Sequence, residues 1–246
     1  DIIYAITVDS QGNLWVGNEN GLDRFNPQSD SFKHYRHDAN NPDSLSDGAV
    51  MAITEDRQGN LWVGTSKGLN QFNYKNEKFK RYQHDTNEPK SLSHDEVLAI
   101  TEDRQGKLWV GTKYGGLNRF TPQTETFQNY QHDANVPHSL SRGGINAITE
   151  DRQGNIWVGT NAGGLNQYNP KTQQFTHYRH QTNDANSLSA DYVLSIIEDS
   201  QDDLWIGSFG GGLNHFDPKA EQFTHYRHQE SEANSLSDDD VICIIE

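Results

Sequence analysis

Two short segments differ between otherwise repeated stretches of this sequence, and they hold many of the side chains that could bind a ligand. One segment follows each Ser-Leu-Ser and contributes His94, Asp95, Arg142, Asp191 and Tyr192. The other lies in a turn about twenty residues further on and contributes Lys67, Lys113, Tyr114, Asn161 and Phe209. Charged and amide groups can orient a polar ligand, and aromatic rings can stack on it. The mixture predicts a binding surface for a sugar-like ligand; the alternative is that these are freely varying loop residues.

Carboxylates in the first segment leave an enzymatic alternative open. They are Asp47, Asp95, Glu96, Asp191 and Asp239. A glycosidase needs two carboxylates facing each other across its substrate, and these residues could supply such pairs. The sequence has no G-x-S-x-G, G-x-x-x-x-G-K or H-E-x-x-H motif. We therefore predict a non-enzymatic protein, with a polysaccharide lyase or glycosidase as the alternative.

Candidate metal ligands are better explained by structure. An Asp-x-x-Gly element recurs at Asp9, Asp56, Asp103, Asp151 and Asp199, always where two strands need a tight turn. One carboxylate per turn is far from the six to eight oxygens that Ca²⁺ takes. The Gln201-Asp202-Asp203 variant adds acid, and Asp202 tolerates the left-handed conformation of the glycine it replaces. Histidines such as His177 and His180 are expected to be polar residues of an exposed outer strand. We predict neither a metal site nor a cofactor.

These residues are set in a repeat of about 48 residues. Trp15, Trp62, Trp109, Trp157 and Trp205 are spaced 47, 47, 48 and 48 residues apart. The repeats span 1–47, 48–94, 95–142, 143–190 and 191–238. In the third repeat, strands are expected at 97–101, 108–112, 117–120 and 126–130, because β-branched and aromatic runs alternate with Gly, Asp and Pro turns.

The first two strands of each repeat are apolar on both faces, so both faces must be covered. Identical sheets stacked around an axis cover each other, which predicts an all-β fold, a β-propeller of five four-stranded blades. Small residues such as Ala52 and Ala99 are expected where the inner strands crowd together. The two variable segments then lie on the same side of each blade and converge on one face.

The repeat resembles the two-component regulator propeller repeat. The pattern V-x-A-I-x-E-D-x-x-G-x-L-W-V-G-T-x-x-G-G-L-N-x-F carries the resemblance, most specifically at 53–65, with near copies at 100–112 and 148–160. The resemblance implies the sensor region of an extracytoplasmic (periplasmic) regulator, often one that recognises glycans. It places any membrane contact in other parts of a parent protein. The copies are also alike enough for an engineered or recently amplified scaffold without a ligand.

Composition limits the partners. The chain has 246 residues and a net charge of −15, which excludes a broadly basic nucleic-acid surface. Aromatic residues make up 10% of the sequence, enough to build a core despite an apolar content of 32%. Cys243 is the sole cysteine, so no internal disulfide is possible.

The stretch 239–246 repeats the first strand of a unit, as does 1–8. Five blades need that strand five times, and the sequence holds it six times. We predict that 241–245 either completes the first blade in place of the amino-terminal strand, or causes self-association by pairing with another chain. A compact five-bladed ring is favoured over a partial arc of a longer ring.

Overall fold

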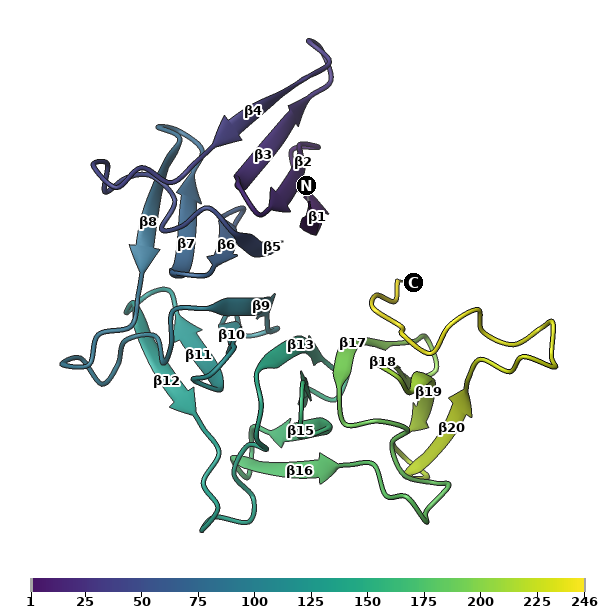
Figure 1. The fold of residues 1–246 in the computed structure, drawn as a ribbon. Helices are drawn as coiled ribbons and strands as arrows, with labels where there is room; N and C mark the ends of the chain where they lie inside the picture. The colour runs from purple at the N-terminus through teal and green to yellow at the C-terminus, as the bar shows by residue number, and fades with distance from the viewer. Residues whose placement is uncertain (1, 246) are drawn as a thin grey trace. The chain divides into compact units, whose positions relative to one another are not determined.

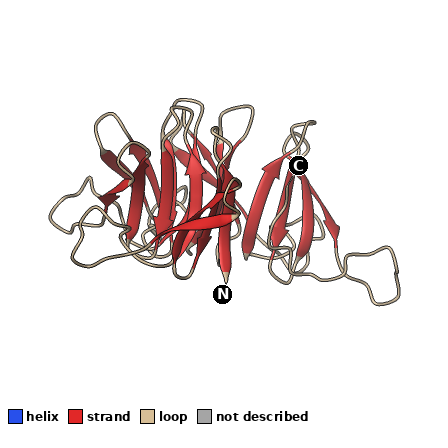
Figure 2. Cartoon of the chain, turned by 90° about the horizontal axis from the view of Figure 1, so that it is seen from above, coloured by secondary structure: helices blue, strands red, loops and turns tan. Residues whose placement is uncertain are grey.

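The computed structural model describes residues 2–245, and in that range the regular structure is entirely β (Figure 2). The described strands form five four-stranded sheets, one for each repeat, and neighbouring strands in each sheet are consecutive along the chain (Figure 1). The prediction of five four-stranded blades is confirmed. The chain divides after Asn129 into two compact units, and each is described by itself.

The first blade consists of β1 (Ile3–Val8), β2 (Leu14–Asn18), β3 (Gly21–Asn26) and β4 (Ser31–Tyr35). The second consists of β5 (Val50–Glu55), β6 (Leu61–Thr65), β7 (Gly68–Asn73) and β8 (Lys78–Tyr82). The third consists of β9 (Val97–Glu102), β10 (Leu108–Thr112), β11 (Leu117–Thr121) and β12 (Thr126–Tyr130). The fourth consists of β13 (Ile145–Glu150), β14 (Ile156–Thr160), β15 (Leu165–Asn169) and β16 (Gln174–Tyr178). The fifth consists of β17 (Val193–Glu198), β18 (Leu204–Ser208), β19 (Gly212–Asp217) and β20 (Gln222–Tyr226).

The turn between the first two strands of each blade is built on its aspartate. In the second blade, the Asp56 carboxylate accepts hydrogen bonds from the backbone amides of Gln58 and Asn60 at 3.0 and 2.9 Å. Its other oxygen accepts from the indole nitrogen of Trp62 at 2.8 Å. The same indole bond links Asp9 to Trp15, Asp103 to Trp109, Asp151 to Trp157 and Asp199 to Trp205, at 2.8 to 2.9 Å. The turn interpretation of these aspartates is confirmed.

The core of each unit lies between neighbouring sheets. In the first unit, the buried Trp62 ring contacts Phe120 of the next blade edge-on, with centroids 5.5 Å apart. Trp15 contacts Phe72 in the same way at 5.2 Å, and in the second unit Trp157 contacts Phe216 at 5.8 Å. The first, second and fourth blades therefore bury their tryptophans against the aromatic residues of the blade that follows.

Polar bonds join neighbouring blades at the Asp turns. The Glu55 carboxylate, at the end of β5, accepts from the backbone amide of Ser10 in the preceding blade at 2.6 Å. Glu102 accepts from the amide of Arg57 at 2.9 Å, and in the second unit Glu198 accepts from the amide of Arg152 at 3.0 Å. The glutamate that ends the inner strand of one blade thus holds the Asp turn of the preceding blade in place.

Neighbouring blades approach each other closely at the glycine of the second strand, a position that was not singled out in the sequence. A Cβ atom added to Gly64 would lie 2.6 Å from the Cγ1 of Val97 in the next blade. Gly17 and Gly159 approach Val50 and Val193 in the same way. Ala52 and Ala99 are buried, but the glycine sets the spacing.

The prediction that 241–245 replaces the amino-terminal strand is wrong. β1 pairs with β2, with Thr7 opposite Trp15, so the inner position of the first blade is already filled. Residues 240–245 form no strand, and Ile242 is 70% exposed. We call the stretch between the fourth strand of one blade and the first strand of the next repeat a connector, and this segment begins as the other connectors do. The Gly212 amide donates to the Asp239 carbonyl at 2.8 Å, as the Gly164 amide donates to the Asp191 carbonyl at 3.0 Å. With no second strand to pair with in the described range, it does not extend further as β structure.

We expect the substitution Gly64→Ala to lower the free energy of unfolding by about 1–3 kcal/mol, because the added methyl overlaps Val97. Urea denaturation measures the effect. In a Val97→Ala background the same substitution should cost clearly less, because the clashing methyl is gone. Equal costs in the two backgrounds would show that the glycine does not set the spacing between blades.

Candidate functional site

The two variable segments lie side by side in the blades, as the sequence predicted. In the third blade, the Lys113 amide donates to the Glu96 carbonyl at 2.9 Å. In the fifth blade, the Phe209 amide donates to the Tyr192 carbonyl at 2.9 Å. We call this end of the blades the connector face; it comprises the segment after each Ser-Leu-Ser and the turn after each second strand, and each unit has its own.

In the first unit, the connector face carries a cluster of aromatic and charged side chains. The Lys113 ammonium lies 2.8 Å from the Glu96 carboxylate and 5.3 Å from the centre of the Tyr114 ring. His94 contacts the same ring edge-on at 5.2 Å. The Glu96 carboxylate raises the pKa of Lys113, so the amine stays charged. Tyr114 is 71% exposed, and its ring is open to a ligand.

In the second unit, two exposed aromatic residues meet on the connector face. The rings of Tyr192 and Phe209 lie 5.5 Å apart and are inclined at 42°. The side chains are 40% and 53% exposed. Exposed aromatic pairs of this kind are unusual outside interaction surfaces.

Other predicted residues on the connector face have structural partners or lie at its edge. The Lys67 ammonium is 3.8 Å from Asp47, whose carboxylate also accepts from Ser66. The Asn161 side-chain oxygen accepts from the Gly144 amide at 2.9 Å, and that bond holds the connector in place. Arg142 is exposed.

The aspartates predicted as ligand-binding anchor the connectors. The Asp95 carboxylate accepts from the His84 amide at 2.6 Å, and Asp191 accepts from the His180 amide at 2.7 Å. Asp239 accepts from the His228 amide in the same way at 2.7 Å. These bonds tie each carboxylate to the backbone that follows the fourth strand of the preceding repeat.

Asp47 is held in its charged form. Burial raises the pKa of Asp47, but hydrogen bonds from Ser66 and the Gly48 amide and the charge of Lys67 outweigh it, so its pKa lies below the usual range. The carboxylates on the connector face are thus tied to the frame or paired with lysines, and this weakens the glycosidase alternative.

The histidines that follow the fourth strands hold the connectors in place, a role that was not predicted from the sequence. The Nδ1 atom of each donates to the carbonyl of the Ser-Leu-Ser leucine eight residues later, at 2.7 to 3.0 Å; the pairs are His37–Leu45, His84–Leu92, His132–Leu140, His180–Leu188 and His228–Leu236. The leucines are buried in the first four connectors, so they fill the space beneath these loops. The constant spacing of eight from His to Leu is the signal that could have revealed this bond.

Two cavities in the described part of the chain lie away from the connector face. A cavity of about 500 Å³ in the first unit is bordered by Asn60, Gln71, Tyr74 and Lys80, among others. A cavity of about 480 Å³ in the second unit is bordered by Trp205, Leu213 and Tyr226. None of the predicted site residues lines either one.

Among residues 2–245, no helix long and apolar enough to cross a membrane is present.

An all-β repeat propeller with variable loops at one end of its blades is the class of protein that this fold and face define. The family model described as "Two component regulator propeller" matches residues 1–20, 44–67, 91–114, 139–162 and 187–210. Each match covers the first two strands of a blade, and the last four also cover the end of the preceding connector. The chain belongs to the two-component regulator propeller repeat family.

Solved structures share this fold. The extracellular domain of the putative one component system BT4673 from B. thetaiotaomicron is 23% identical, with a TM-score of 0.76 over 98% of this chain and 29% of that one. The extracellular domain of the putative hybrid two component system BT3049 from the same organism is 25% identical, with a TM-score of 0.59 over 99% of this chain and 37% of that one. Virginiamycin B lyase from Staphylococcus aureus is 19% identical, with a TM-score of 0.67 over 91% of this chain and 69% of that one.

This chain therefore spans about a third of the length of the two sensor domains that it matches. The similarity to the lyase shows a shared fold. No curated protein matches the sequence.

We expect Asp103→Ala to lower the free energy of unfolding by about 1–3 kcal/mol, because the buried Trp109 indole loses its acceptor. The matched control is Asp85→Ala, which removes an exposed carboxylate bonded to the Asn87 amide, and it should change stability by less than about 0.5 kcal/mol. Urea denaturation of both variants gives the comparison. Equal costs would contradict the role of the Asp–Trp bond.

We expect acid to destabilise the second unit partly through His177. Burial lowers the pKa of His177 below its usual value, although a hydrogen bond to the Ser139 carbonyl opposes the shift. Because the unfolded chain binds the proton more readily, the contribution of His177 to stability is fully present above about pH 6.5. It is lost as the pH falls below that value through the lowered pKa of the folded state. The variant His177→Gln should show a shallower loss of melting temperature between about pH 7 and pH 5. An identical pH profile would exclude this contribution.

Proposed function

We propose that this chain is the ligand-binding part of an extracytoplasmic sensor of the two-component type, and that its connector face binds a polar ligand such as a glycan. The observation that supports this most is the exposure of Tyr114, Tyr192 and Phe209. All three occupy variable positions on the connector face, whereas the aromatic residues of the repeated frame are mostly buried.

Exposed rings cost solvation free energy unless a partner covers them, and the frame does not need them. A sugar ring has an apolar face that stacks on an aromatic ring and hydroxyls that accept and donate hydrogen bonds. The Lys113–Glu96 pair beside Tyr114 offers both a donor and an acceptor within reach of a stacked ligand. The first unit therefore has the elements of a small glycan subsite.

The known proteins with similar structures support the setting of this proposal. The two sensor domains described above are extracellular domains of putative one-component and hybrid two-component systems. The shared fold and repeat family favour the same placement for this chain, outside the cytoplasm.

An enzyme is the second candidate because one of the similar structures is a lyase. The carboxylates of the connector face argue against it. Asp95 and Asp191 are bonded to backbone amides, and Glu96 is paired with Lys113. Glycan turnover that vanishes in Asp95→Asn or Asp191→Asn would favour the enzyme over the sensor.

The test is a binding screen of soluble oligosaccharides from bacterial and plant polysaccharides by calorimetry. For a glycan that binds the first unit, Tyr114→Ala and Lys113→Ala should each weaken binding by about tenfold, equivalent to roughly 1.4 kcal/mol. For one that binds the second unit, Phe209→Ala should have the same effect. The matched control is Phe32→Ala, which removes a ring that is 46% exposed on β4, outside the connector face.

Binding that is unchanged in all three connector-face variants would overturn the location of the site. A screen in which no oligosaccharide binds would overturn the choice of glycans as the ligand class.

A further inference from the structure

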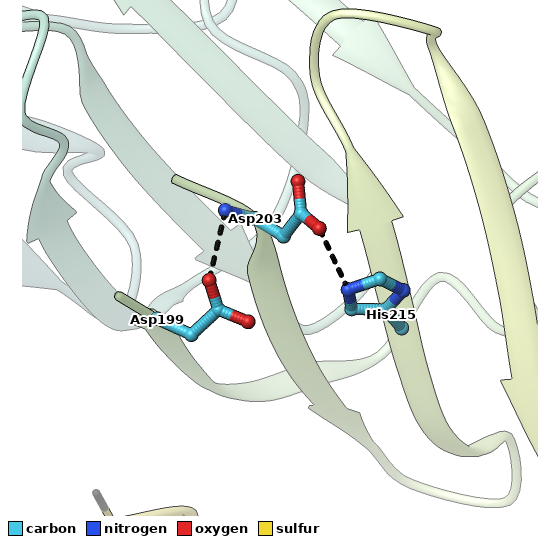
Figure 3. Close-up of side chains that lie close together, drawn as sticks. All are labelled: Asp199, Asp203 and His215. Atoms are coloured by element: carbon cyan, nitrogen blue, oxygen red, sulfur yellow. Dashed lines mark hydrogen bonds and ion pairs between the residues drawn. The ribbon is translucent and has the colours of Figure 1, made fainter. Parts of the chain in front are cut away.

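The fifth blade differs from the other four at its first turn. Asp199 and Asp203 lie at the two ends of the turn between β17 and β18, and His215 lies on β19 beside them (Figure 3). One ligand atom from each of the three side chains lies within 4.8 Å of the other two. The Asp203 carboxylate and His215 Nε2 are 3.1 Å apart.

The equivalent positions of the other blades have different chemistry. Asn60 and Asn155 stand at the position of Asp203, and their side-chain amides donate to the turn aspartates Asp56 and Asp151 at 2.9 and 2.8 Å. The strand register places Gln71 opposite Trp62 and Gln167 opposite Trp157, where His215 is opposite Trp205. In the first and third blades the same position holds Arg24 and Arg119.

The change from asparagine to Asp203 replaces a hydrogen-bond donor by an acceptor. The fifth blade thus has two carboxylates close together where the second and fourth blades have one carboxylate bonded to an amide. Like charges this close together repel. A cation between them removes the repulsion. One imidazole nitrogen with two carboxylate oxygens is a ligand set that Zn²⁺ and similar ions accept.

The three side chains are accessible and already oriented. Asp203 and His215 are 17% and 26% exposed, and Asp199 is less buried than Asp56 or Asp151. The Trp205 indole donates to one Asp199 oxygen at 2.9 Å, and its ring lies 4.6 Å from that of His215. Such outer contacts fix the orientation of metal ligands.

The neighbouring acid Asp202 does not compete for the ion. Its carboxylate is paired with Arg152 at 2.9 Å and with Lys219 at 3.4 Å. Its backbone takes the left-handed conformation, with φ of 70°, that glycine supplies in the other turns. Asp202 therefore completes the turn, while Asp199, Asp203 and His215 face one another.

We propose that Asp199, Asp203 and His215 bind one divalent transition-metal ion of the Zn²⁺ type. Three protein ligands leave room for water in the fourth position of a tetrahedral site. The site is independent of the connector face, because it belongs to the turn between the first two strands rather than to the variable segments.

The test is calorimetric titration of the metal-free, untagged chain with Zn²⁺. One strong site is expected, and Asp203→Asn and His215→Gln should each weaken it at least about tenfold. Both variants introduce the residues that the second and fourth blades have at these positions, so their folding should be kept, as circular dichroism can verify. The control His225→Gln removes a neighbouring histidine that bonds to the Ser187 carbonyl, and it should leave Zn²⁺ binding unchanged.

A converse experiment builds the site elsewhere. The double variant Asn60→Asp, Gln71→His should raise the stoichiometry of Zn²⁺ from one to two. Absence of a Zn²⁺ site in the original chain, or equal affinity in Asp203→Asn and His215→Gln, would overturn the proposal.

Discussion

A single blade of this protein cannot bury its own core, and this constraint governs the rest of the structure. Both faces of the inner strands are apolar, so each sheet needs a neighbour. Trp62 is covered by Phe120 and Trp15 by Phe72, each from the next blade along the chain. Burying a large side chain contributes roughly 1.5–3 kcal/mol, which makes contacts between blades the main source of stability. The glycines and turn aspartates common to all five repeats, and the glutamates of the last four, serve this contact.

The frame was largely predictable from the sequence because it repeats. The strands 108–112 and 126–130 were predicted with the bounds that the structure has. The turn aspartates were recognised as structural, but their bond to the tryptophan six residues later was not, although the spacing is the same in all five repeats. A turn signal explains the backbone conformation and says nothing about which buried donor the second carboxylate oxygen meets.

The end of the chain was predicted less well. Because 239–246 repeats the first strand of a unit, 241–245 was a candidate for the first blade, yet β1 holds that place. Propensity describes how readily a segment forms a strand, and pairing decides whether it does.

The candidate site was also predicted only in part. The sequence placed the two variable segments at one end of the blades, and Glu96 and Lys113 do meet there. It could not separate side chains that face a ligand from those that hold the loop. Asp95 and Asp191 proved to anchor backbone amides, whereas Tyr114 remained exposed. The cluster at His215 was also missed, because strand pairing brings it to a turn more than ten residues away in the chain.

The account separates a repeated frame that makes the blades from variable residues that meet a ligand. Hydrogen–deuterium exchange, with and without a bound oligosaccharide, tests this separation most directly. The account predicts slower exchange in the variable segments of the unit that binds, 94–96 with 113–116 or 190–192 with 208–211, and no change in the outer strands. Protection confined to the outer strands or to the Asp turns would contradict it.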